Sequence, residues 1–273
     1  MPKSLNILLV GCGKMGGAML RGWLARGIDA TAVRVVEPFD QAADALRTEL
    51  SVLVVSAADE LEPDYSPDIV VFAVKPQGME EIVPAYAGSL TENAVVLSIA
   101  AGRNIGFFEN HLGQGVAVVR TMPNTPAAVG RGITAACANA AVSADQRSAC
   151  QSLLEAIGEV VWVGDEALID PVTAVSGSGP AYVFWMIECL ARAGEAQGLP
   201  ADTAEKLARA TVAGSGELAR LSNESAETLR VNVTSPGGTT AAALEVLMAD
   251  DGLAELMDRA VAAATRRSRE LAG

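Results

Sequence analysis

The stretch NILLVGCGKMGGAMLRGWLARG, residues 6–27, contains the change of pattern that decides the fold. It begins with a continuous apolar run, breaks at glycines, and then places apolar side chains at helical spacing. These side chains are Met15, Met19, Leu20, Trp23 and Leu24. The pattern predicts a buried strand, a tight turn and an amphipathic helix in immediate succession.

Three glycines in the turn form the pattern G-x-G-x-x-G, at Gly11, Gly13 and Gly16. In dinucleotide-binding folds the first glycine permits the bend, the second lets a pyrophosphate approach, and the third lets helix and strand pack closely. The phosphates then lie on free N–H groups at the helix start. Glycines also serve ordinary turns, but the position between a first strand and an amphipathic helix favours dinucleotide binding.

A second strand, AVRVVEP at residues 32–38, ends in Glu37, about 20 residues beyond the last glycine of the turn. A carboxylate at this place accepts hydrogen bonds from the adenosine ribose and repels a 2′-phosphate, which favours NADH over NADPH. The alternative is a solvated glutamate at the end of a strand.

Four further apolar runs alternate with segments that can form short helices. They are SVLVVS (51–56), DIVVFAV (68–74), AVVLSIAAG (94–102) and GVAVVRTMPNTPA (115–127). Such runs predict an α/β fold with a doubly wound, mostly parallel sheet covered on both faces.

Ligands of such sheets lie beyond the carboxyl ends of the strands, here at residues 73–77, 98–102 and 121–126. Lys75 is the charged residue among them. It either serves the cofactor or is a plain surface lysine.

The second half of the chain loses the strand pattern, so we place a domain boundary between residues 164 and 165, giving domains 1–164 and 165–273. Five alanine-rich helices are expected, at 181–198 and at about 201–221, 224–231, 239–249 and 252–271. A bundle of this kind can require a partner chain to complete its core. Before the first helix, SGSGP (176–180) is either a helix cap or part of a site. In the first case Ser178 caps, Pro180 lies in the first turn, and Tyr182, Phe184 and Trp185 are core residues.

The segment VTSPGGTTAAALEVL, residues 233–247, carries more polar groups than a helix start requires. Pro236 stops the preceding segment, Gly237 and Gly238 leave the backbone bare, and Thr239 and Thr240 place hydroxyls in the next first turn. One Ser or Thr suffices for a cap. The surplus favours a socket for a carboxylate, formed by hydroxyls, free N–H groups and the helix dipole.

Composition excludes several classes of protein. The net charge of −13 argues against nucleic acid and anionic membrane partners, and 50% hydrophobic residues support a sizeable core. The cysteines, Cys12, Cys137, Cys150 and Cys189, form no CxxC pair, so we expect free thiols, no metal site and a cytoplasmic location. No run approaches the roughly 20 apolar residues of a membrane span.

Taken together, these segments resemble the pyrroline-5-carboxylate reductases, the last enzymes of proline biosynthesis. VTSPGGTTAAAL looks like the C-terminal signature of that family. GCGKMG, FAVKPQ, SIAAG, VVRTMPNTP and SGSGPAYVF are similar to its other motifs in the same order, over roughly residues 5–250.

The resemblance implies an N-terminal Rossmann domain, an all-α C-terminal dimerisation domain and larger assemblies of the homodimer. It implies NAD(P)H as cofactor, contacted by Gly11, Cys12, Gly13, Lys14, Met15 and Gly16, by Ala73, Val74, Lys75 and Pro76, and near the nicotinamide by Ile99, Ala100 and Ala101. It also implies that Ser235, Gly237, Gly238, Thr239 and Thr240 hold the substrate carboxylate and ring nitrogen.

The mechanism expected from this resemblance is hydride transfer to the carbon of a cyclic imine, with Thr240 hydrogen-bonded to the ring nitrogen. The one histidine, His111, is expected in a loop and outside the chemistry. Two alternatives are a β-hydroxyacid dehydrogenase and a non-catalytic dinucleotide sensor. A β-hydroxyacid dehydrogenase would use a lysine in the second half of the chain, but Lys206, the lysine found there, lacks the glycine-rich context of such sites. A dinucleotide sensor needs no second site for a small ligand, so the carboxylate socket argues against it.

Overall fold

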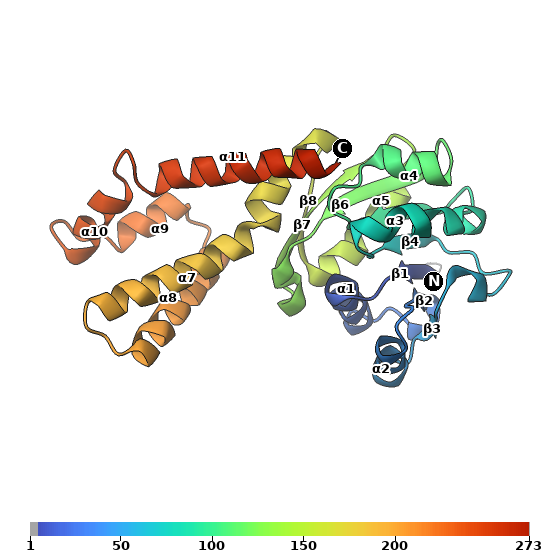
Figure 1. Ribbon diagram of the computed structural model, residues 1–273, viewed down its shortest axis with the longest axis horizontal. Helices are drawn as coiled ribbons and strands as arrows, with labels where there is room; N and C mark the ends of the chain where they lie inside the picture. The colour runs from blue at the N-terminus through green and yellow to red at the C-terminus, as the bar shows by residue number, and fades with distance from the viewer. Residues whose placement is uncertain (1–4, 273) are drawn as a thin grey trace. The chain divides into compact units, whose positions relative to one another are not determined.

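The computed structural model describes residues 5–272, drawn in Figure 1. By contacts within the chain, residues up to 177 together with those from 265 onward form one compact unit, and residues 178–264 form a second. Residues 165–177, which the sequence pattern assigned to the helical domain, therefore group with the sheet. The division into domains at residue 165 stays a prediction.

The first unit is built on one eight-stranded sheet with the order β3-β2-β1-β4-β5-β6-β7-β8. All neighbouring strands are parallel except β6 and β7, which are antiparallel. The strands are β1 (Ile7–Val10), β2 (Val33–Val36), β3 (Leu53–Val55), β4 (Ile69–Phe72), β5 (Val95–Ser98), β6 (Ala117–Met122), β7 (Gly132–Ala138) and β8 (Gly158–Trp162). The predicted α/β class with a mostly parallel sheet is confirmed.

Helices cover both faces of this sheet (Figure 1). The α-helices are α1 (Lys14–Ala25), α2 (Asp40–Leu50), α3 (Met79–Ile82), α4 (Ile105–Leu112), α5 (Ala144–Leu154) and α6 (Ile169–Val172). Short 3₁₀ turns are η1 (Ala30–Ala32), η2 (Ala58–Glu60), η3 (Pro76–Gly78), η4 (Val83–Ser89), η5 (Thr125–Val129), η6 (Glu155–Ile157) and η7 (Glu166–Leu168), and a π-helical turn, η8 (Thr173–Gly177), follows α6.

Alternation along β1 shows why the chain winds on both sides. Ile7 and Leu9 join a core cluster with side chains of α1, α2 and α5, whereas Leu8 and Val10 join a second cluster with side chains of α3 and α4. Successive side chains of a strand point to opposite faces, so a strand that is apolar throughout needs cover on both.

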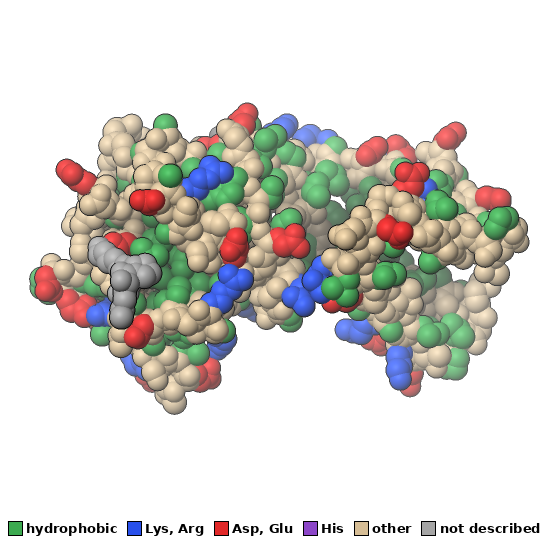
Figure 2. Space-filling model, turned by 180° about the vertical axis from the view of Figure 1, so that it is seen from behind, with side chains coloured by type: hydrophobic (Ala, Val, Ile, Leu, Met, Phe, Trp, Pro, Cys, Tyr) green, Lys and Arg blue, Asp and Glu red, His purple; other side chains and the backbone are tan. Residues whose placement is uncertain are grey.

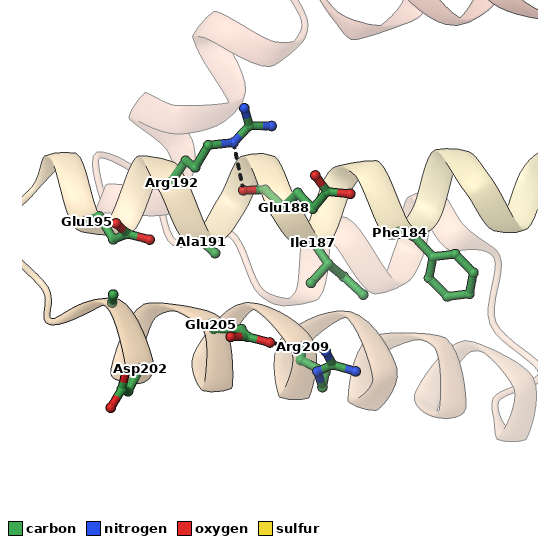
Figure 3. A pocket seen from close by; sticks show the side chains of 10 residues that line it. Phe184, Ile187, Glu188, Ala191, Arg192, Glu195, Asp202, Glu205 and Arg209 are labelled. Carbon is green, nitrogen blue, oxygen red and sulfur yellow. Dashed lines mark hydrogen bonds and ion pairs between the residues drawn. The ribbon is translucent and has the colours of Figure 1, made fainter.

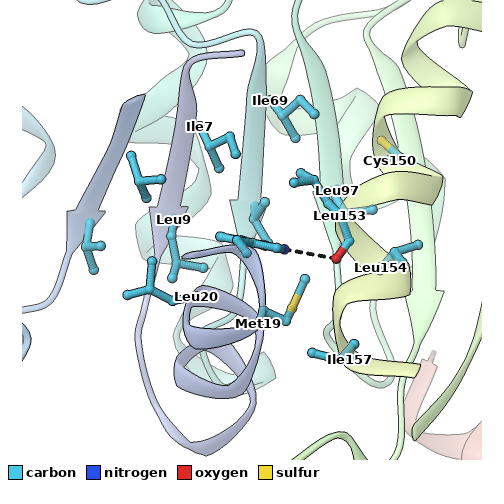
Figure 4. Packing of buried hydrophobic residues seen from close by; sticks show 14 of the residues in the cluster. Ile7, Leu9, Met19, Leu20, Ile69, Leu97, Cys150, Leu153, Leu154 and Ile157 are labelled. Carbon is cyan, nitrogen blue, oxygen red and sulfur yellow. Dashed lines mark hydrogen bonds between the residues drawn. The ribbon is translucent and has the colours of Figure 1, made fainter. Parts of the chain in front are cut away.

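The first of these clusters is the larger of the two. Figure 4 shows side chains of β1, α1 and α5 meeting over the sheet. The indole N–H of Trp23 donates to the carbonyl of Leu153 at 2.9 Å, so the polar atom of this buried ring has a partner. This bond fixes α1 against α5, and with it the direction in which the start of α1 points.

Two strands, β7 and β8, lie outside the six apolar runs predicted from the sequence. β7 consists of GITAACA, whose small side chains carry little of the β-branched signal that identified the first six strands. It is the antiparallel strand of the sheet, and it pairs on its other side with β8. Its pairing is dictated by a tertiary contact that hydrophobic periodicity alone does not report.

The second unit is helical, as predicted. Its helices are α7 (Gly179–Ala196), α8 (Ala201–Leu221), α9 (Ala226–Asn232), α10 (Thr239–Leu247) and the first part of α11 (Leu253–Ala272), whose residues from 265 onward belong to the first unit. At the contact of α7 and α8 the side chains are small: a Cβ on Gly194 would lie 3.4 Å from the Cβ of Ala204. No helix among residues 5–272 is long and apolar enough to cross a membrane.

Candidate functional site

The strand order reverses beside β1, and this reversal creates the crevice in which α/β sheets bind ligands. The chain runs from β1 outward to β2 and β3, then returns to the other side of β1 as β4 and continues to β5 and β6. The loops after β1 and β4 therefore diverge to opposite faces of the sheet. A ligand enters between them at the carboxyl ends of the strands.

The glycine turn fills this point with bare backbone. Gly11 has φ +85°, and a Cβ there would lie 2.6 Å from Cγ1 of Val74. A Cβ on Gly16 would lie 2.6 Å from the carbonyl oxygen of Gly11. Both positions thus require glycine for reasons internal to the protein.

Gly13 differs from the other two glycines because its space is open. A Cβ there would meet no atom of the protein within 4 Å. Gly13 is the N-cap of α1, has an extended backbone, and makes no side-chain cap. The helix therefore presents N–H groups to an open space, which is the arrangement that binds a pyrophosphate.

Glu37 lies at this turn, as the strand pattern predicted. Its side chain is 6% exposed. Its carboxylate accepts from the N–H of Cys12 at 3.0 Å and from the N–H of Phe39 at 3.3 Å. The interpretation of Glu37 as a solvated glutamate is therefore wrong, since one buried carboxylate holds both the glycine turn and the start of α2.

The segments after β4 and β5 lie beside the glycine turn. The N–H of Ala73 donates to the carbonyl of Val10 at 2.8 Å, and the N–H of Ile99 donates to the carbonyl of Phe72 at 3.2 Å. Adjacent pairing of β1, β4 and β5 thus brings the three sequence-predicted segments to one edge of the sheet. Lys75 is exposed at this edge.

Cys12 lies in the glycine turn and carries no reactive thiolate at neutral pH. Burial and, second, the negative charge of Glu37 raise the pKa of the Cys12 thiol to about 11. A thiol with this pKa is a poor nucleophile. Among residues 5–272 no cluster of His, Cys, Asp and Glu side chains is arranged to hold a metal ion.

The predicted carboxylate socket lies at the start of α10 in the second unit. The helix begins at Thr239 with Gly238 as N-cap, and no side chain caps it. Gly237 has φ +67° and is exposed, and the N–H of Gly238 donates to the carbonyl of Ser235 at 3.0 Å. The first N–H groups of the helix consequently have no partner within the helix. Their assignment to a substrate stays a prediction.

Three local expectations were wrong. His111 lies in α4, not in a loop, and its Nδ1 is 2.8 Å from the carbonyl oxygen of Phe107. Ser178 is the N-cap residue of α7 and Pro180 lies in the first turn, as predicted, but the Ser178 side chain makes no capping hydrogen bond. On α7, Phe184 and Trp185 are 59% and 56% exposed, so within this chain they are not core residues.

Sequence reasoning also missed polar residues that join the loops at the edge of the sheet. The amide of Asn124, after β6, donates to the carbonyl of Ser176 at 3.1 Å and accepts from the N–H of Ile133 at 2.9 Å. It ties the π-helical turn η8 to the end of β6, and π-helical turns are frequent at functional sites. Asn124 stood within the quoted TMPNTP segment, so its position after a strand was the available signal.

A partly buried ion pair joins further elements of the first unit. Arg120 on β6 contacts Glu166 at 2.8 Å, and the same carboxylate oxygen accepts from the N–H of Ile105 at the start of α4. The three elements β6, η7 and α4 are thereby joined through one carboxylate. Arg120 and Glu166 are 46 residues apart, so the sequence pattern around either residue does not predict that they pair.

Two hollows, of about 310 Å³ and about 630 Å³, lie in the surface of the protein. The larger lies between α7 and α8, and Figure 3 shows charged side chains around its rim. Its floor includes Ala191, and Phe184 lies at one end. It holds none of the sequence-predicted site residues.

Comparison with known proteins agrees with this geometry. The family described as pyrroline-5-carboxylate reductase dimerisation matches residues 166–271. The family described as NADP oxidoreductase, coenzyme F420-dependent, matches residues 6–102, which contain the glycine turn and Glu37.

Relatives extend the likeness over nearly the whole chain. A pyrroline-5-carboxylate reductase from Pseudomonas aeruginosa is 41% identical over 98% of this chain and 97% of its own. The structure of a pyrroline-5-carboxylate reductase from Coxiella burnetii is 36% identical and covers 99% of this chain and 100% of its own, with a TM-score of 0.93. A pyrroline carboxylate reductase from Plasmodium falciparum, solved with NADP bound, is 29% identical and covers 99% of both chains, with a TM-score of 0.82.

The different surroundings of the glycines lead to a prediction that separates ligand binding from folding. Gly13→Ala adds a methyl group to the open space and should weaken NADH and NADPH binding about tenfold or more, with the urea midpoint of unfolding unchanged. Gly16→Ala must displace the backbone of Gly11, so it should lower both the affinity for NADH and NADPH and the urea midpoint of unfolding. Fluorescence titration and urea unfolding measure the two quantities, and equal destabilisation by both substitutions would contradict the assignment.

Proposed function

Because this chain belongs to the pyrroline-5-carboxylate reductase family, we infer that it reduces 1-pyrroline-5-carboxylate to L-proline with NAD(P)H, the last step of proline biosynthesis. The observation that carries this inference is the 41% identity over 98% of the chain to a reductase of that name. The open space above Gly13, at the switch point of the sheet, supports NAD(P)H as the hydride donor.

The chemistry requires positioning more than acid catalysis. A protonated cyclic imine already carries the positive charge that attracts hydride, so the protein need not supply a strong acid. It must hold the imine carbon about 3–3.5 Å from the hydride-bearing carbon of the nicotinamide. A rigid dinucleotide site and a second site for the substrate carboxylate satisfy this requirement.

We propose that the substrate carboxylate binds at the start of α10. Gly237 leaves its backbone exposed, Gly238 supplies an N-cap without a side chain, and Thr239 and Thr240 follow in the first turn. The uncapped N–H groups and the dipole of the nine-residue helix favour an anion there. Ser235 adds a hydroxyl one turn earlier.

Thr240 is the residue we propose for the ring nitrogen. It is half-buried whereas Thr239 is exposed, so its hydroxyl is the better shielded of the two. A hydroxyl both donates and accepts, and can therefore hydrogen-bond the imine nitrogen and pass on a proton from water.

Glu37 leads us to propose a preference for NADH over NADPH. Its carboxylate is buried and fixed by two backbone N–H groups, so it cannot turn away from a ligand at the end of β2. The added phosphate of NADPH would approach a fixed negative charge in a partly desolvated place.

We further propose that the protein acts as a homodimer that builds larger assemblies in the cytoplasm. Residues 166–271 match a dimerisation family. Figure 2 shows hydrophobic side chains on the surface of the helical unit, and α7 exposes Val183, Phe184, Trp185 and Met186. Exposed apolar patches of this kind mark contacts between proteins. All four cysteines are free, as in a reducing compartment.

The proposed reaction is tested by mixing the purified protein with pyrroline-5-carboxylate and either NADH or NADPH. We expect absorbance at the nicotinamide band to fall and proline to form in equal amount. Replacing the imine with a 2-hydroxy acid and oxidised cofactor is the control for a hydroxyacid dehydrogenase. Binding of the cofactor without turnover of the imine would favour a dinucleotide sensor and sink the proposal.

The cofactor preference is tested by comparing initial rates with NADH and NADPH in wild type and in Glu37→Gln. We expect kcat/KM to be higher with NADH in wild type, and the ratio to fall about tenfold in the variant because the fixed charge is gone. Glu49→Gln, an exposed carboxylate of α2, is the matched control and should leave the ratio unchanged. A wild type that prefers NADPH would refute the role of Glu37.

The role of Thr240 is tested with Thr240→Val, which keeps the shape of the side chain, and Thr240→Ser, which keeps the hydroxyl. Loss of a hydrogen bond to a charged group is expected to lower kcat/KM for pyrroline-5-carboxylate roughly 10- to 100-fold in the first variant. The serine variant should recover most of this, and the Kd of NADH should stay within about twofold in both. Normal turnover by the valine variant would remove Thr240 from the mechanism.

A further inference from the structure

Arg103 links the loop after β5 to the loop after β4, and both loops belong to the proposed dinucleotide site. It follows directly after the loop Ile99–Gly102 at the end of β5, and its side chain turns to the loop after β4. Its side chain is 23% exposed, so most of the guanidinium is enclosed.

The guanidinium is held on three sides. Nε and Nη2 both donate to the carbonyl of Pro76, at 3.2 and 3.0 Å. Nη1 pairs with Glu80 at 3.1 Å, and the guanidinium lies 4.7 Å from the ring centroid of Phe107 on α4. Two donors on one carbonyl need the planar fork of arginine, which a lysine cannot reproduce.

The gripped carbonyl belongs to a segment that the proposed function assigns to the cofactor. Pro76 begins the turn η3, which closes when the N–H of Gly78 donates to the carbonyl of Lys75 at 3.1 Å. Fixing the Pro76 carbonyl therefore fixes the plane of the Pro76–Gln77 peptide, one residue beyond Val74 and Lys75. These residues stand opposite the glycine turn, where Val74 contacts Gly11.

On its other side the loop after β5 has little room to move. Gly102 has φ +72°, and a Cβ there would lie 2.9 Å from the carbonyl oxygen of Leu271, near the end of α11. Ser268 on the same helix donates to Asp170 at 2.7 Å, which anchors that end of α11 within the first unit. Because α11 limits the loop after β5 on this side, the hydrogen bonds of Arg103 also fix the loop after β4 relative to it.

We propose that Arg103 is a positioning residue for the reduced dinucleotide, holding the loops at 73–76 and 99–101 at one fixed separation. The inference rests on the proposed function, because it takes both loops as walls of the cofactor site. Without the clamp the two loops would order separately on binding, and each ordering step lowers the affinity for the cofactor.

The test compares Arg103→Met and Arg103→Lys with wild type. The side chain borders the hollow of about 310 Å³, so both replacements fit without displacing neighbours. We expect the KM and the fluorescence-measured Kd of the preferred cofactor to rise about tenfold in both variants. The KM for pyrroline-5-carboxylate and the kcat at saturating cofactor should stay within about twofold.

Glu80→Gln is the matched control. It removes the ion pair, whose carboxylate is 64% exposed, and leaves both bonds to Pro76 in place. Water reaches the Glu80 side of the pair and weakens it, so the cofactor KM should stay within about twofold of wild type. If Glu80→Gln and Arg103→Met lower the cofactor affinity equally, the ion pair with Glu80 and not the grip on Pro76 is responsible, and the proposal is overturned.

Urea unfolding of the free proteins separates positioning from a structural role. A variant with Arg103→Met that unfolds at lower urea but keeps the wild-type Kd for NADH and NADPH would overturn the inference. A wild type that binds either dinucleotide but does not reduce the imine would count against the proposed function alone, and the Kd comparison would still decide the role of Arg103.

Discussion

The approach of the glycine turn to the end of β4 is the contact on which the rest of the molecule depends. Gly11 meets Val74, and Gly16 meets both Gly11 and Ala73, at distances that leave no space for a Cβ. This packing lets α1 start directly above the sheet, so that its N–H groups open beside the loops after β4 and β5. A larger side chain at either glycine would lift the helix away from the loops after β4 and β5, and so separate the proposed phosphate and nicotinamide sites.

A protein with a net charge of −13 binds two anions in the proposed reaction, and it does so with little positive charge. Backbone N–H groups at the starts of α1 and α10 supply the attraction instead, because neither helix start has a side-chain cap. Such groups are fixed in direction, whereas lysine side chains would attract phosphates generally. In the proposed reaction the buried carboxylate of Glu37 would discriminate among the anions that the amides attract.

The sequence pattern predicted the features that depend on neighbouring residues. The strand–glycine–helix succession, the position of Glu37 and the start of α10 at Thr239 all depend on residues that are close in the sequence. The fork of Arg103 on Pro76, the bridge of Asn124 to Ser176 and the strand β7 join residues that are far apart. These contacts exist only after the sheet order is set, and one sequence holds no signal for them beyond the position of a polar residue after a strand.

The proposed substrate site in the helical unit depends on the association of that unit with another surface. Among residues 178–264 the buried hydrophobic residues are Ala191, Ala204 and Ala208, which are too small to form a core. Phe184 and Trp185 are 59% and 56% exposed instead, whereas full burial of a large apolar side chain contributes roughly 1.5–3 kcal/mol. Helices without a core order through packing against another surface. The start of α10 lies in this same unit, so the precision with which it would hold the proposed substrate carboxylate depends on what covers those side chains.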